Sequence, residues 1–202
     1  LDALTDHRTL KALSLRFESS LENVDALATC AALESIELTH CPRLEHVDGL
    51  SSHAKLTGGP LGPGRVEESF TLSHCTGLKS VAGIGQLTHL KSLRLLNCES
   101  LESIEPLANL TSLTHLDLYN CRSLLSIDVV ANFEALEELN LWHCQSLTDV
   151  TALRHLPNLR KLCLAGCKQL GFYEGAEEAP DFEAANLTSR EDVSAWLKAL
   201  GG

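Results

Sequence analysis

The stretch Leu113–Leu124, LTHLDLYNCRSL, returns 23 residues later as Leu136–Leu147, LEELNLWHCQSL. Both follow the pattern L-x-x-L-x-L-x-x-C-x-x-L, which also begins at Leu90 and at Leu159. A fixed period of this length is typical of stacked, nearly identical units that share one continuous core. The repeat therefore predicts a solenoid, whose long open face suits binding better than the enclosure of a small molecule.

The register of this repeat extends over most of the chain. If each repeat is numbered from its first leucine as offset 0, apolar residues or cysteine recur at offsets 3, 5, 8, 11, 14, 17 and 20. The same register holds in residues 70–87 and 10–53, and Leu1 and Leu4 fit the second half of a further repeat. We predict seven strand-bearing repeats and an amino-terminal half repeat within residues 1–170, and we expect the chain to be a fragment of a larger protein.

Each repeat predicts the same pair of elements. The leucines at offsets 3 and 5 alternate with outward positions, which indicates a short strand over offsets 2–6. All strands point the same way and pair in order, so they form a parallel sheet on the concave side. The second half of each repeat is too short for a long helix and predicts 3-10 or irregular turns on the convex side. The fold class is thus an α/β solenoid shaped as a horseshoe arc.

Two segments depart from the repeat. Residues 56–66, LTGGPLGPGRV, are rich in glycine and proline and predict an inserted surface loop, or alternatively a binding loop. Residues 171–202 begin with an acidic stretch and then predict a helix over about 189–200, in which Val193 and Trp196 share an apolar face. We predict that residues 171–202 cap the open end of the solenoid, with Trp196 as the main contact.

Composition narrows the class of partner. The formal net charge of −11 argues against a broad phosphate-binding surface, and therefore against nucleic acid. No stretch approaches the roughly 18 consecutive apolar residues of a membrane span. We expect a protein or peptide partner and no cofactor. Oligomeric state has no signature in the sequence.

Six cysteines share offset 8 of their repeats: Cys41, Cys75, Cys98, Cys121, Cys144 and Cys167. This offset points inward at the turn after the strand, where an S–H group can donate to a neighbouring carbonyl. We predict structural thiols, and because buried reduced thiols favour a reducing compartment we expect a cytoplasmic location. Cys163, at the outward offset 4, is the thiol that we expect to be exposed.

Histidine precedes three of these cysteines, and His40 and His74 lie one repeat apart on the predicted concave rim. A zinc site there is the alternative to plain surface residues, but the neighbouring thiols are expected to point into the core. The sequence lacks the spacing of a P-loop, a nucleophile elbow or a metalloprotease. We therefore predict no metal site, no catalytic residues and no enzymatic activity in these residues.

The repeats resemble leucine-rich repeats, over about 170 of the 202 positions. Cysteine where many such repeats carry asparagine is similar to the cysteine-containing repeats of plant disease-resistance and F-box proteins, although those are usually longer. The segment Ser103–Leu113, SIEPLANLTSL, is similar to the convex segment of bacterial internalins, whose repeats are one residue shorter. The resemblance implies a recognition or scaffolding module that binds proteins.

Three outward columns of the predicted concave face point to a binding site. At offset 6, Leu96, Tyr119 and Trp142 follow one another on adjacent strands and form an apolar stripe. Polar residues flank this stripe at offsets 4 and 2: Arg94, Asp117, Asn140, Ser92, His115 and Glu138. Large apolar anchors ringed by polar groups are typical of protein-binding hot spots. The alternative is that the aromatic rings stabilise the sheet by packing across strands.

The sequence thus predicts a non-enzymatic module that binds a protein or peptide on its concave face, over residues 90–165. One alternative is a fixed structural subunit of a large assembly, docked by its convex face or its amino-terminal edge. Another is the substrate-recognition arm of a larger multidomain protein such as a ubiquitin ligase.

Overall fold

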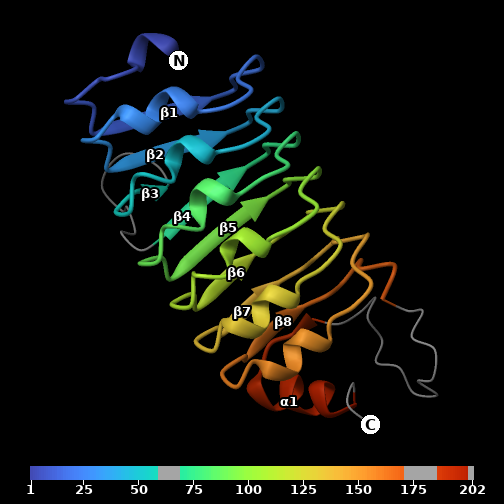
Figure 1. Cartoon of the computed structure of the whole chain (residues 1–202). Helices are drawn as coiled ribbons and strands as arrows, with labels where there is room; N and C mark the ends of the chain where they lie inside the picture. The colour runs from blue at the N-terminus through green and yellow to red at the C-terminus, as the bar shows by residue number, and fades with distance from the viewer. Residues whose placement is uncertain (59–68, 171–185, 200–202) are drawn as a thin grey trace.

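The computed structural model describes residues 1–58, 69–170 and 186–199. Seven strands lie at the predicted offsets of successive repeats: β1 (Ala12–Arg16), β2 (Ser35–Thr39), β4 (Ser69–Ser73), β5 (Ser92–Leu96), β6 (His115–Asp117), β7 (Glu138–Asn140) and β8 (Lys161–Cys163). They pair side by side in chain order, all parallel, with residues of equal offset opposite each other. The predicted solenoid with one parallel sheet is confirmed (Figure 1).

The core is a stack of leucine layers along one side of this sheet. Burial alternates along the strands, so that Leu93 is fully buried while Arg94 is exposed. In the next repeats Leu116, Leu139 and Leu162 fill the same offset and are 1%, 2% and 1% exposed. Removing one such side chain from water contributes about 1.5–3 kcal/mol, which is why the 23-residue period overrides local preferences.

Short 3-10 helices build the opposite, convex side, as predicted: η1 (Asp2–Leu4), η2 (Asp25–Thr29), η3 (Asp48–Leu50), η4 (Ala82–Ile84), η5 (Glu105–Leu107), η6 (Asp128–Asn132) and η7 (Thr151–His155). Neighbouring repeats approach closely there. A Cβ atom on Gly83 would lie 1.9 Å from the carbonyl oxygen of Val47 in the preceding repeat. Glycine is therefore needed at this point for the two repeats to stack.

The insertion begins later than the sequence predicted. Leu56 is fully buried, and its amide donates to the carbonyl of His53, the same bond that closes the other repeats. Thr57–Gly58 then form a two-residue strand, β3, that pairs with β2. The prediction of a loop over residues 56–66 is thus wrong for its first three residues, although Leu56 follows Leu33 by the regular 23 positions. The rest of the insertion lies outside the described residues.

The carboxyl-terminal end carries the predicted helix, α1 (Arg190–Ala199), in which Val193 and Trp196 are buried. Before it, β9 (Asn186–Leu187) adds to β8 in the antiparallel direction, an element that the repeat pattern does not predict. Over the described residues, no helix combines the length and the apolarity needed to cross a membrane. The acidic stretch 171–185 lies outside them, so the boundary of the cap at 171 stays a prediction.

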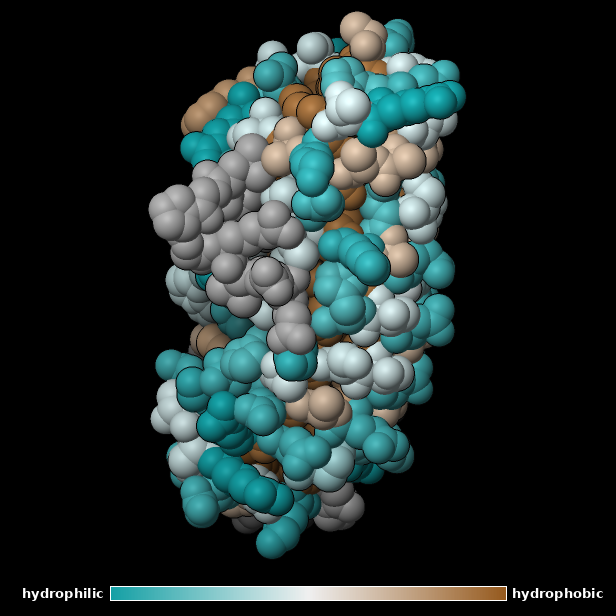
Figure 2. Space-filling model, turned by 90° about the vertical axis from the view of Figure 1, so that its left-hand side faces the viewer, coloured by the Kyte–Doolittle hydropathy of each residue, from teal (hydrophilic) through white to brown (hydrophobic). Residues whose placement is uncertain are grey.

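The amino-terminal end differs from the rest of the core. Leu4, Leu10, Leu13 and Leu15 are only partly buried, whereas their counterparts in later repeats are fully covered. Figure 2 shows apolar side chains reaching the surface at this upper end of the molecule. The leucine layer at this end is therefore the least covered part of the described core.

Candidate functional site

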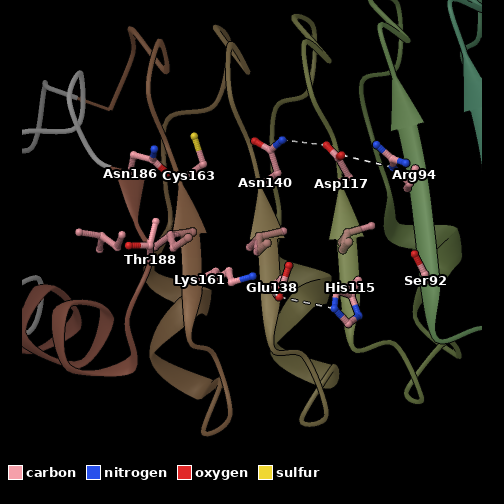
Figure 3. Close-up of a pocket in the computed structure, with 14 residues that line it drawn as sticks. Ser92, Arg94, His115, Asp117, Glu138, Asn140, Lys161, Cys163, Asn186 and Thr188 are labelled. Carbon is pink, nitrogen blue, oxygen red and sulfur yellow. Dashed lines mark hydrogen bonds and ion pairs between the residues drawn. The ribbon is translucent and has the colours of Figure 1, made fainter.

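Strands β5 to β9 surround a hollow of about 450 Å³ on the concave face (Figure 3). Five of the eight predicted binding residues line it: Arg94, His115, Asp117, Glu138 and Asn140. Each comes from offset 2 or offset 4 of its strand, so its side chain stands on the face opposite the leucine core. The regular register of the sheet brings these five together from three repeats.

One row of the hollow is a chain of polar contacts at offset 4. Arg94 Nε lies 3.5 Å from Asp117 Oδ2, and Asn140 Nδ2 donates to Asp117 Oδ1 at 2.9 Å. Asp117 and Asn140 also hold the backbone two residues further along their own strands. Asp117 Oδ1 accepts from the amide of Tyr119, and Asn140 Oδ1 accepts from the amide of Trp142. The offset-4 row therefore positions the aromatic residues two places further on.

A second row, at offset 2, is an ion-pair chain. His115 Nε2 and Lys161 Nζ lie 3.6 Å and 2.6 Å from Glu138 Oε1. The hydrogen bond from Lys161 lowers the pKa of Glu138, and the nearby charges of His115 and Arg160 act in the same direction. The floor of the hollow thus carries charges of both signs that are already paired before any partner arrives.

The aromatic residues form a step beside the hollow. The ring centroids of Tyr119 and Trp142 are 4.6 Å apart with planes tilted by 55°, and the His143 ring meets Trp142 edge-on at 4.6 Å. All three side chains are partly buried. Tyr119 and Trp142 therefore pack against each other across strands, and both residues remain partly accessible to solvent. Leu96, the third member of the predicted stripe, is partly buried at the end of β5 and does not line the hollow.

The hollow also contains residues that we did not predict as binding residues. Lys161 and Cys163 occupy offsets 2 and 4 of β8, so extending the two columns by one repeat would have found them. Asn186 and Thr188 close the hollow from the side of β9. The repeat pattern does not predict these two residues, because they lie beyond its last leucine.

The rim of the sheet, formed by the turn residues at offset 7 of each repeat, carries stacked rings in its amino-terminal half. The residue directly after each of the four five-residue strands has a positive φ, and so do the equivalent residues of later repeats, Asn120, His143 and Gly166. Phe17, His40 and His74 hold such positions, and their rings stack at centroid distances of 4.6 Å and 4.2 Å. Asparagine and glycine adopt this backbone readily, whereas a bulky residue such as phenylalanine adopts it at a cost.

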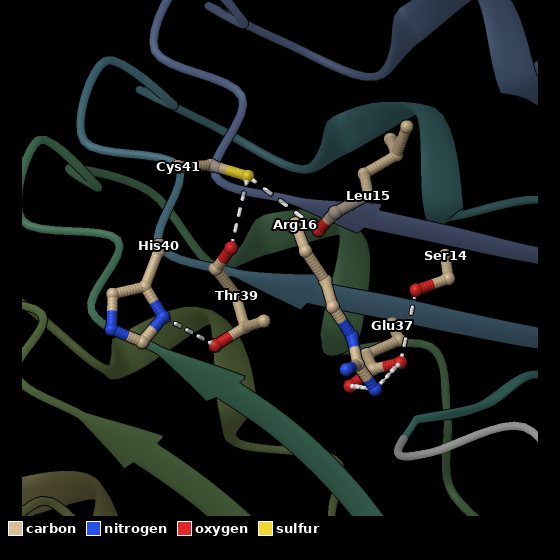
Figure 4. A network of polar contacts seen from close by, with 7 residues as sticks. All are labelled: Ser14, Leu15, Arg16, Glu37, Thr39, His40 and Cys41. Atoms are coloured by element: carbon tan, nitrogen blue, oxygen red, sulfur yellow. Dashed lines mark hydrogen bonds and ion pairs between the residues drawn. The ribbon is translucent and has the colours of Figure 1, made fainter.

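The two rim histidines do not converge on a common point. Their rings are parallel within 6°, and each Nδ1 pairs with the hydroxyl of the preceding residue, Thr39 or Ser73. Figure 4 shows the first of these pairs beside the ion pair of Arg16 with Glu37. Within the described part of the chain, no group of three or more histidine, cysteine or acidic residues could hold a metal ion.

The cysteine ladder is buried, as predicted, and each thiol has a backbone partner. Cys121, Cys144 and Cys167 donate to the offset-5 carbonyl of the preceding repeat, over 3.3, 3.3 and 3.0 Å. Burial raises the pKa of Cys121 and of Cys167 to about 12. At the amino-terminal end of the ladder, a hydrogen bond from Cys75 lowers the pKa of Cys41. Cys163 is the one cysteine of the chain that is not buried.

The stacked repeats, the parallel concave sheet and the polar outward columns define a leucine-rich repeat solenoid. Residues 67–171, just over half of the chain, match six copies of one family pattern. The chain belongs to the family described as the BspA type leucine rich repeat region. This confirms the resemblance to leucine-rich repeat proteins. Modules of this architecture act through extended concave surfaces in protein–protein interaction.

Solved structures support the same fold. An internalin, InlF, from Listeria monocytogenes aligns with 20% identity and a TM-score of 0.53, over 82% of this chain and 51% of its own. The leucine-rich repeat domain of the type III effector XopL aligns with 21% identity and a TM-score of 0.57, over 81% of this chain and 63% of its own. The chain therefore spans less than two thirds of either structure. None of the curated proteins matches the sequence.

Proposed function

We propose that this chain is a non-enzymatic recognition module that binds a protein or peptide on the concave face of β5–β8. The observation that carries the proposal is the pairing of the Tyr119–Trp142 step with a preformed polar hollow beside it. Partly buried aromatic rings supply a large rigid contact area at a low entropic cost, and the surrounding polar groups set the register of the partner.

The preformed ion pairs support this role. Because Arg94, Asp117 and Asn140 already contact one another, their side chains lose little additional freedom when a partner binds. Most of the binding free energy is then expected to come from Tyr119 and Trp142. The polar rows are expected to exclude partners that would leave one of these charges buried without its counterpart.

A capture experiment tests the proposal. The wild-type chain, Trp142→Ala and the matched variant Thr39→Ala, which changes the same offset on β2, are immobilised and exposed to native lysate. Mass spectrometry is expected to find a partner that the wild type and Thr39→Ala retain and that Trp142→Ala loses. Identical captures by the wild type and both variants, with thermal unfolding matched, would contradict a role of Tyr119 and Trp142 in binding.

One observation favours a second candidate, a fixed subunit docked by its amino-terminal edge. Leu4, Leu10, Leu13 and Leu15 leave the first leucine layer partly exposed beside β1. A neighbouring subunit on this layer would bury apolar area that is now in water. For such a subunit, Trp142→Ala would leave assembly unchanged, while Leu13→Glu would prevent it.

A further inference from the structure

A second groove lies at the carboxyl-terminal end, between α1 and the chain that follows η7. Its volume is about 340 Å³, and it shares no lining residue with the concave hollow. Its surface is formed chiefly by six residues: Arg154, Pro157, Arg190, Ser194, Leu197 and Lys198. The groove is therefore a separate surface, built from the helix and the last convex turn.

The groove has an apolar base. Leu156, Leu159 and Val193 lie beneath it and are 4%, 3% and 1% exposed, so they hold the helix against the last repeat. Above them, Leu197 is partly exposed and Pro157 is exposed. These two side chains leave an apolar strip on which an aliphatic or aromatic group can rest.

The rim of the groove is basic, although the chain as a whole carries a charge of −11. Its lining includes Arg154, Arg190 and Lys198 and no acidic residue. In the described part of the chain, neither Arg190 nor Lys198 takes part in an ion pair. Most other lysine and arginine side chains in the repeats pair with an acid of a neighbouring repeat, such as Arg160 with Glu137.

The position of Arg190 makes this concentration of charge more notable. It is the first residue of α1, where the helix dipole favours negative charge. The residues that follow, Glu191 and Asp192, obey that preference. Arg190, Ser194, Leu197 and Lys198 are spaced by four, three and one residues, so they share one stripe of the helix that borders the groove. Helix electrostatics alone do not account for a cation there.

We propose that this groove docks an acidic segment of a partner protein, with carboxylates against Arg190 and Lys198 and an apolar side chain on Leu197 and Pro157. Charge complementarity carries the assignment. The acidic surface of the rest of the chain would disfavour such a segment elsewhere and so restrict it to this groove. The inference is independent of the function proposed for the concave face.

The test uses a fluorescein-labelled peptide of alternating glutamate and leucine, and the same peptide with glutamine in place of glutamate. Fluorescence anisotropy with the full chain is expected to show binding of the glutamate peptide only, weakening as salt is raised. Arg190→Glu should reduce its affinity tenfold or more. The helix should persist in this variant, because an acid suits its first turn.

Lys55→Glu is the matched control, since it makes the same change in net charge at an exposed residue outside the groove. Equal affinity for the two peptides, or an equal loss in Lys55→Glu, would overturn the proposal. A final variant replaces the five acids of residues 171–185 by their amides. Unchanged affinity supports a partner segment, whereas a tenfold rise would assign the groove to this chain's own acidic stretch and contradict the proposal.

Discussion

The two halves of the concave sheet are built on the same backbone but display different chemistry. On β2 and β4 the outward positions that reach the surface hold mostly small hydroxyl residues: Thr39, Ser69, Thr71 and Ser73. On β5 to β8 the same positions hold the aromatic step and the charged rows around the hollow. The inward side chains of β2 and β4 are as fully buried as those of β5 to β8. The leucine core therefore constrains the inward positions of the strands, and the outward columns are free to differ between the two groups of strands.

The rim repeats this contrast in another form. In the amino-terminal half, rings stack from Phe17 to His74. In the carboxyl-terminal half, Asn120 Nδ2 donates to Asn97 Oδ1 at 2.8 Å. Stacked rings and an asparagine ladder hold the same left-handed turn by different contacts. The positive φ is thus common to the turns of both halves, whereas the side-chain contacts across them differ.

The largest expected effect is one that both halves share. Leu139→Ala on β7 and Leu38→Ala on β2 should each lower the free energy of unfolding by about 2–5 kcal/mol, because each leaves a cavity in a buried layer. Ser73→Ala, which changes an outward position, should stay within about 0.5 kcal/mol. Urea unfolding measures all three. A half whose leucine can be removed without cost would show that the core is not continuous.

Asn120→Ala should be the costliest change on the rim, at about 1–3 kcal/mol. Asn120 is 8% exposed and has a φ of +59°. Its loss removes the bond to Asn97 and leaves alanine in a left-handed backbone. Asn120→Gly separates the two causes, since glycine keeps the backbone free and removes only the bonds. Equal losses in both variants would mean that backbone strain plays no part.

The ion-pair row predicts a smaller, pH-dependent effect. The pKa of Glu138 is lowered in the folded state, so its contribution to stability is present above the ordinary glutamate pKa of about 4.3 and is lost as the pH falls below it. Because Glu138 and Lys161 are partly exposed, Glu138→Gln should cost only about 0.2–1 kcal/mol at pH 7. Urea unfolding from pH 7 to pH 3 should show this difference shrinking, and a difference that grows would contradict the sign.

The smallest expected effect has the opposite sign. Phe17 is 70% exposed with a φ of +60°. Phe17→Asn should raise the free energy of unfolding by about 0.5 kcal/mol, because relief of the left-handed strain slightly exceeds the lost stacking on His40. Phe17→Ala keeps the strain and loses the ring, so it should be destabilising. Thermal unfolding of both variants compares them directly, and a stabilising Phe17→Ala would rule out a useful ring contact.

The core side chains could be predicted because each of them is repeated at a fixed offset. Leu116, Leu139 and Leu162 follow from the period alone, and so do the strands that hold them. The same register predicted which outward side chains share a face, and five of the eight line the hollow. Their contacts could not be predicted, because the tilt of Trp142 toward Tyr119 depends on rotamers and not on spacing.

Elements that end the periodicity were harder to predict. Strand β9 runs antiparallel to β8 beyond the last repeat, so no preceding copy indicated it. The misplaced start of the insertion had a different cause. Glycine and proline after Leu56 dominated the interpretation, although the 23-residue count from Leu33 placed that leucine in the core. Burial of one leucine outweighed the turn-forming residues beside it.

In the function that we propose, the partner binds the carboxyl-terminal half of the concave face. The most direct test is the dissociation constant of the captured partner, measured for wild type and two matched double variants. Tyr119→Ala/Trp142→Ala should weaken binding by about 30-fold or more, which corresponds to about 2 kcal/mol. Ser73→Ala/Thr39→Ala, at the same offset on β4 and β2, should stay within about twofold. Equal affinities for all three proteins, or a loss confined to the Ser73→Ala/Thr39→Ala variant, would contradict the claim.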